Sequence, residues 1–190
     1  MANRAIRTLV GVGVIAGLGG LAPAMAAELP QGERTIYLLE TSGEPHEVGT
    51  VEFSTGGNGG MTYTLDMDLS VFKDFFLSMK EMKCLEGPDV WCFIPYPYNN
   101  PHSVTADDLR WLEHDLLFMF KEPQTFGANL WNGIYYAMEV DGDVIRGQAR
   151  AVDLNMLASP PDDQTVPPYG EYDISEFDAD KRWLPMLEIR

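Results

Sequence analysis

The turn dipeptide Asp141-Gly142 constrains the fold of this chain more than any other feature. It separates two β-forming segments, residues 130–140 and 144–152, and Asp-Gly favours a two-residue turn between antiparallel strands. Such a turn pairs even-numbered residues of the first strand with odd-numbered residues of the second. One face then carries the apolar and small residues, which are Ile134, Tyr136, Met138, Ile145, Gly147 and Ala149. Arg146, Gln148 and Arg150 fall on the opposite face, so the pattern and the turn predict the same hairpin.

Period-two alternation recurs along the chain. The clearest example runs from residue 61 to 68, where apolar and polar residues alternate as in a strand with one buried face. Alternation from Phe75 towards Cys84 predicts one continuous strand, and further strands are expected at residues 35–40, 47–53, 90–94 and 183–189. Residues 116–120 are either the end of a helix or a buried strand. The proline-rich segment 159–170 predicts an extended excursion over the surface.

One short helix is expected around residues 105–117. The Thr105 hydroxyl can cap its first turn, and Asp107 and Asp108 lie near its positive end. Leu109, Leu112 and Leu116 share one face of this helix. Together with roughly seven to nine short strands, the pattern predicts a mostly β fold, a small antiparallel barrel or sandwich.

The first 26 residues have the pattern of a cleaved secretory signal peptide. Arg4 and Arg7 precede an apolar run over residues 9–21, and Ala24-Met25-Ala26 provides small residues for cleavage after Ala26. The alternative, an uncleaved membrane anchor, is disfavoured because the run is short and rich in glycine. We therefore expect an exported protein, periplasmic or extracellular, with one globular β-rich domain over residues 27–190 and no stable membrane insertion after cleavage.

The charge of the chain excludes some partners. There are 13 basic and 29 acidic residues, which gives a net charge of −16, and removal of Arg4 and Arg7 makes it −18. A surface this acidic repels nucleic acid and anionic lipid. We therefore expect no nucleic-acid partner.

Cys84 and Cys92 are the two cysteines of the chain, and Gly87-Pro88-Asp89 lies between them. These turn-forming residues can reverse the chain and place the two cysteines opposite each other in a hairpin. In an oxidising compartment we expect a structural disulfide. The alternative of a redox-active pair lacks the Cys-X-X-Cys spacing that lowers a thiol pKa.

Two segments resemble known groups of proteins. Residues 132–143, Asn-Gly-Ile-Tyr-Tyr-Ala-Met-Glu-Val-Asp-Gly-Asp, resemble a hairpin of the small lipocalin-like domains that bacteria export. Residues 83–98 resemble exported proteobacterial proteins of unknown function. The first resemblance implies at most a β-barrel with an apolar cavity, and neither supplies a functional residue.

A stiff segment follows the second cysteine and combines aromatic residues with prolines. Its aromatic residues Trp91, Phe93, Tyr96 and Tyr98 are the expected binding residues, because aromatic faces give large contacts at low entropic cost. The expected partner is a small apolar or ring-bearing ligand, or a protein. In the alternative interpretation, Trp91, Phe93 and Tyr96 cover one end of the core.

Histidines offer the candidates for catalysis. Glu113-His114-Asp115 places an imidazole between two carboxylates, but neighbouring residues on a helix point about 100° apart. We therefore expect His114 to be a surface histidine or one with its hydrogen bonds satisfied. His46 and His102 have no partners at zinc-motif spacing, and no motif calls for a metal or cofactor. A site assembled in space from His102 and His114 stays open.

Two classes of function remain. The favoured one is an exported, non-enzymatic binding or interaction domain of the envelope or periplasm, because catalytic motifs are missing. The alternative is a small exported hydrolase or metal-dependent enzyme that uses His102 or His114 with nearby carboxylates.

Overall fold

The computed structural model describes residues 28–56 and 60–190 of the chain. The signal peptide predicted at residues 1–26 lies outside these residues. In the described part, no helix combines the length and the apolar character that a membrane crossing requires.

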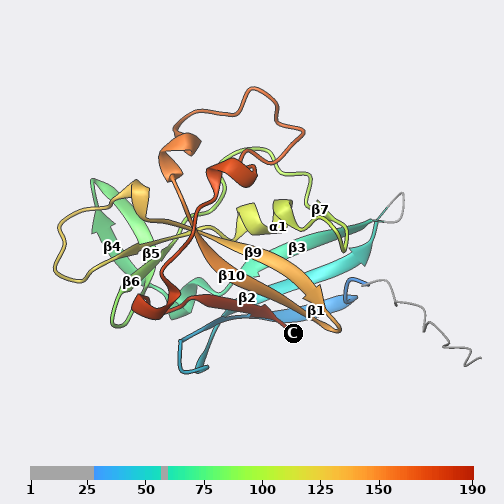
Figure 1. The fold of residues 1–190 in the computed structure, drawn as a ribbon, viewed down its shortest axis with the longest axis horizontal. Helices are drawn as coiled ribbons and strands as arrows, with labels where there is room; N and C mark the ends of the chain where they lie inside the picture. Colours follow the sequence, from blue (N-terminus) through green and yellow to red (C-terminus); the bar gives the residue numbers. More distant parts are fainter. Residues whose placement is uncertain (1–27, 57–59) are drawn as a thin grey trace, which may run out of the picture.

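Eleven strands form one antiparallel sheet in the described part of the chain (Figure 1). They are β1 (Gly32–Leu39), β2 (Pro45–Thr55), β3 (Met61–Met67), β4 (Lys73–Leu77), β5 (Lys80–Glu86), β6 (Val90–Phe93), β7 (Ser103–Val104), β8 (Phe118–Lys121), β9 (Gly133–Asp141), β10 (Val144–Val152) and β11 (Met186–Ile189). The order across the sheet is β4-β5-β6-β8-β9-β10-β11-β1-β2-β3-β7. The two end strands, β4 and β7, do not pair with each other, so the sheet is not closed. The prediction of a mostly β fold with one short helix is confirmed, and the open sheet is consistent with the sandwich form.

A short helix, α1 (Arg110–Asp115), contacts β7 on one side and β9 on the other (Figure 1). β8 pairs with only two residues of β9, Gly133 and Ile134. Beyond this pairing, α1 packs against β9 in place of β8. The helix is shorter than predicted, because the backbone of Thr105 pairs with that of Asp108 and forms a turn before the helix. Thr105 therefore does not cap α1. Leu112 of α1 and Leu116, which follows the helix, are buried in the core.

The β9–β10 hairpin has the register that its turn predicts. Tyr136 lies opposite Ala149, and Met138 lies opposite Gly147. A Cβ atom on Gly147 would lie 3.0 Å from Cβ of Tyr136. The small residue therefore gives the tyrosine the space that it occupies.

The disulfide prediction is also confirmed. Cys84 of β5 and Cys92 of β6 lie directly opposite each other and are bonded. The strand predicted from Phe75 to Cys84, in contrast, is wrong. The chain reverses at Ser78 and Met79, which adopt φ angles of 49° and 66°, and this turn separates β4 from β5.

The remaining chain consists of loops and short 3-10 turns, which are η2 (Leu69–Val71), η3 (Leu130–Asn132), η4 (Leu154–Ala158), η5 (Glu171–Asp173) and η6 (Ala179–Lys181). The predicted excursion over residues 159–170 contains no strand or helix. It is anchored by Tyr169, whose side chain is fully buried. The ambiguous segment 116–120 is largely the buried strand β8.

Candidate functional site

Glu113, His114 and Asp115, the last three residues of α1, point to three different partners. His114 is fully buried. Its Nδ1 lies 2.6 Å from the carbonyl oxygen of Arg110, and its Nε2 accepts the backbone N–H of Tyr169 at 3.1 Å. This arrangement requires the neutral tautomer with the proton on Nδ1. Both ring nitrogens are occupied, so His114 is the satisfied histidine that the helical geometry predicts.

The environment of His114 keeps its ring neutral. The ring stacks on Tyr169 with 5.2 Å between the centroids and lies edge-on to Tyr135 and Tyr96. Burial disfavours the imidazolium and lowers the pKa of His114 to about 4. A metal ion or substrate could use this ring only after one of its hydrogen bonds had broken.

Glu113 is buried against β9. Its Oε1 accepts the backbone N–H of Met138 at 2.6 Å, and its Oε2 accepts the hydroxyl of Tyr135. Burial raises the pKa of Glu113, although these two hydrogen bonds oppose the shift. The carboxylate thus accepts a backbone N–H of β9 beyond the residues that pair with β8. Its role is structural.

Asp115 forms a pair with His102 that the sequence pattern does not show. Its Oδ2 accepts the hydroxyl of Tyr63 at 2.8 Å and lies 3.3 Å from Nε2 of His102. The side chain of Asp115 is only 12% exposed, whereas that of His102 is 55% exposed. Burial raises the pKa of Asp115, and the hydrogen bond from Tyr63 opposes this shift. The result is a shielded carboxylate behind an accessible imidazole.

The backbone of His102 is held in an unusual conformation. Its φ angle of 48° is uncommon for a residue other than glycine. Its N–H donates to Oδ1 of Asn100 at 2.8 Å, and its carbonyl accepts the N–H of Tyr63 at 2.9 Å. His102 and His114 do not form a joint site, because His114 is enclosed by other partners.

The third histidine forms a separate pair. Nε2 of His46 lies 2.9 Å from Oε1 of Glu40, which also accepts the indole N–H of Trp183 at 2.8 Å. Among residues 28–56 and 60–190, no group of three or more His, Cys, Asp or Glu residues could hold a metal ion.

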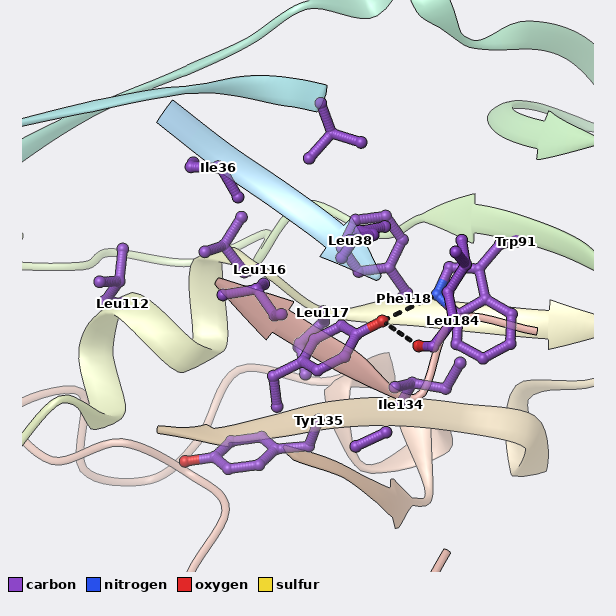
Figure 2. Packing of buried hydrophobic residues seen from close by; sticks show 14 of the residues in the cluster. Ile36, Leu38, Trp91, Leu112, Leu116, Leu117, Phe118, Ile134, Tyr135 and Leu184 are labelled. Atoms are coloured by element: carbon purple, nitrogen blue, oxygen red, sulfur yellow. Dashed lines mark hydrogen bonds between the residues drawn. The ribbon is translucent and has the colours of Figure 1, made fainter. Parts of the chain in front are cut away.

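The predicted binding segment contributes mainly to the core. Trp91 is fully buried (Figure 2), and its indole N–H donates to the Tyr136 hydroxyl at 3.2 Å. Tyr96 is 9% exposed and packs against Trp111 and His114. This is the alternative that the sequence left open, in which the aromatic residues cover the core.

Phe93 and Tyr98 are half-buried. Tyr98 donates its hydroxyl to the carbonyl of Leu157 at 2.6 Å. Phe93, together with Ile94 and Pro95, lines a groove of about 200 Å³ whose other walls are Leu69 and residues 80–83. Phe93 is therefore the predicted aromatic residue that borders an open surface hollow.

Another apolar surface lies at the β4–β5 hairpin. Phe76 is 75% exposed and Met79 is 89% exposed, while Phe126 and Trp131 on the loop before β9 are 101% and 70% exposed. The hairpin and the loop are joined, because Oγ of Ser78 accepts the backbone N–H of Ala128 at 2.9 Å. We call these four residues, Phe76, Met79, Phe126 and Trp131, the apolar tip. Figure 1 shows this loop beside β4 and β5.

Sequence reasoning missed the apolar tip for a physical reason. The alternation from Phe75 towards Cys84 predicts a longer strand that includes Phe76, and residues 122–131 carry no periodic pattern. The exposure of an aromatic residue can be predicted from a sequence only when the bounds of its strand and the buried face of that strand are known. The one available signal was the cluster of large apolar residues on both sides of Ser78.

Two ion pairs form within the hairpin. Lys73 forms an ion pair with Glu86, and Lys83 forms one with Asp74. The pairing with Asp74 raises the pKa of Lys83. The hairpin therefore presents apolar side chains among charges that are already balanced.

Comparison with known proteins adds no relative. No protein-family model matches the chain, and neither a curated protein nor a solved structure matches it.

Proposed function

We propose that this chain is an exported, non-enzymatic interaction domain that binds a protein partner through the apolar tip. The observation that carries the proposal is the exposure of four large apolar side chains, at least 70% each, on two segments joined by a hydrogen bond. Large apolar side chains exposed on neighbouring segments are typical of interaction sites in soluble proteins. Burying one such side chain contributes about 1.5–3 kcal/mol, so the tip can offset much of the entropy lost on association.

The tip has a rigid base. Pairing with β5 holds β4, and the Cys84–Cys92 disulfide joins β5 to β6. A rigid surface loses little conformational entropy when it binds. The disulfide and the signal-peptide pattern of residues 1–26 both support export, because disulfides persist in oxidising compartments.

A photoreactive amino acid at position 126 tests this proposal in the exporting cell. The matched control carries the same group at position 172, because Tyr172 is 99% exposed and lies outside the apolar tip. We expect a cross-linked product of one discrete mass from position 126 and none from position 172. The product should disappear when Met79 and Trp131 are both changed to serine. No product at position 126, or equal products at both positions, would contradict the proposal.

The pairing of His102 with Asp115 favours a second candidate function. A carboxylate behind an accessible imidazole orients the ring, as a general base requires. In this function His102 would remove a proton from a water molecule or hydroxyl group during hydrolysis, and Asp115 would position the imidazole.

Hydrolysis of p-nitrophenyl acetate tests the second candidate. His102→Gln should abolish the rate above that of the buffer, and Asp115→Asn should reduce it. The matched control is His46→Gln, which also removes a histidine paired with a carboxylate, at 2.9 Å from Glu40. Equal rates in the wild type and in all three variants would eliminate this function for His102.

A further inference from the structure

The edge strand β4 has free backbone groups. Its two-residue turn makes Leu77 and Lys80 the closing hydrogen-bonded pair of the hairpin. Hydrogen-bonded and non-hydrogen-bonded pairs alternate along antiparallel strands. Asp74 and Phe76 therefore direct their N–H and C=O groups away from β5. Among the described residues β5 is the neighbour of β4, so these groups face an open edge.

The sequence of this edge is complementary to itself. Residues 74–78 read Asp-Phe-Phe-Leu-Ser. If two copies run antiparallel about a twofold axis at Phe76, each Phe76 lies opposite its equivalent, and each Phe75 lies opposite Leu77. These are aromatic and apolar cross-strand pairs, which stabilise sheets. Because the peptide groups of Phe76 point outward, this register also makes the central pair a hydrogen-bonded one.

Charge favours this edge over other faces of the molecule. The described residues carry all 29 acidic residues and 11 of the 13 basic ones, so two copies repel each other over most of their surfaces. The β4–β5 hairpin carries three lysines, Lys73, Lys80 and Lys83, and three acids, Asp74, Glu81 and Glu86. Two copies meet there with no net charge.

We propose that the partner of the apolar tip is a second copy of this chain, which pairs with β4 antiparallel about a twofold axis at Phe76. This inference rests on the proposed function, because it names the partner of the same surface. An isologous contact of this kind closes on itself and yields a dimer.

Sedimentation equilibrium of the exported chain, purified with its disulfide intact, tests the inference. We expect a dimer with a dissociation constant on the order of 10 µM, typical of a small interface. Phe76→Lys and Phe76→Glu should each weaken the dimer at least ~100-fold, because each places two like charges at the axis. Mixing the two variants should restore a dimer, because the axis brings the lysine of one beside the glutamate of the other. Tyr172→Lys is the control and should leave the dimer unchanged.

The outcomes separate this inference from the proposed function. A wild-type chain that stays monomeric at ~100 µM, a dimer that persists in Phe76→Lys, or variants that do not associate when mixed would each overturn the inference. In those cases a cross-linked product from position 126 that contains a different protein would still support the proposed function. If that product is also absent, both proposals fail.

Discussion

His114 and Tyr169 stack on each other, and the ring of His114 accepts the backbone N–H of Tyr169 across 55 residues of chain. This contact connects α1 to the end of the proline-rich segment 159–170. A histidine that the sequence offered as a catalytic candidate therefore holds a long surface loop in place.

His114 gives the stability of the folded chain a dependence on pH. The folded pKa is lowered to about 4 from 6.5, so between these values the unfolded chain binds a proton that the folded chain does not. The stabilisation is complete above pH 6.5 and is lost as the pH falls towards 4. His114→Gln removes this dependence. Over this range the stability difference between wild type and variant should shrink by up to about 3 kcal/mol, measured by urea unfolding. Parallel pH profiles would contradict this role.

Removal of the hydroxyl of Tyr135 leaves a buried carboxylate with fewer donors. In Tyr135→Phe, Glu113 retains the backbone N–H of Met138 at 2.6 Å and loses the hydroxyl. We expect a loss of about 1–3 kcal/mol in the free energy of unfolding. Tyr172→Phe is the matched control, because its side chain is 99% exposed, and it should change stability by less than about 0.5 kcal/mol.

Gly87 lies against the indole ring of Trp183. A Cβ atom at this position would lie 2.5–2.6 Å from three ring carbons, so Gly87→Ala must displace the ring and strain its hydrogen bond to Glu40. We expect a loss of about 1–3 kcal/mol and a change in tryptophan fluorescence. At Gly170 an added Cβ would have its nearest contact at 3.5 Å, so Gly170→Ala is the control. Equal stability of the two variants would show that Trp183 has room to move.

The disulfide stabilises the base of the β4–β5 hairpin. It closes a short loop, with a sequence separation of 8, and removing it should cost about 2–3 kcal/mol through the entropy of the unfolded chain. The variant with both cysteines changed to alanine should unfold at lower urea concentration than the oxidised wild type. Addition of dithiothreitol should shift the wild type to the same midpoint and leave the variant unchanged. If the oxidised wild type is no more stable than the variant, the disulfide does not stabilise the folded chain.

Local chemistry explains which elements the sequence could predict. Asp141-Gly142 and Gly87-Pro88-Asp89 favour specific turns, and a turn of known length fixes the register of its strands. The turn at Ser78 and Met79 was missed because neither residue favours positive φ. Its conformation is therefore imposed by the strands on either side, not by the turn residues.

The candidate sites were less predictable than the fold. The divergence of Glu113, His114 and Asp115 could be predicted from the sequence, because adjacent positions on any helix point in different directions. The β-rich fold and the disulfide could also be predicted, because they depend on periodicity and on residues close together in the chain. The packing of the folded chain was needed to show that Asp115 meets His102, that Trp91 is buried and that the β4–β5 hairpin is joined to the loop that carries Phe126. Each of these relationships depends on which face of an element packs against which other element, and that is settled by the burial of the whole core.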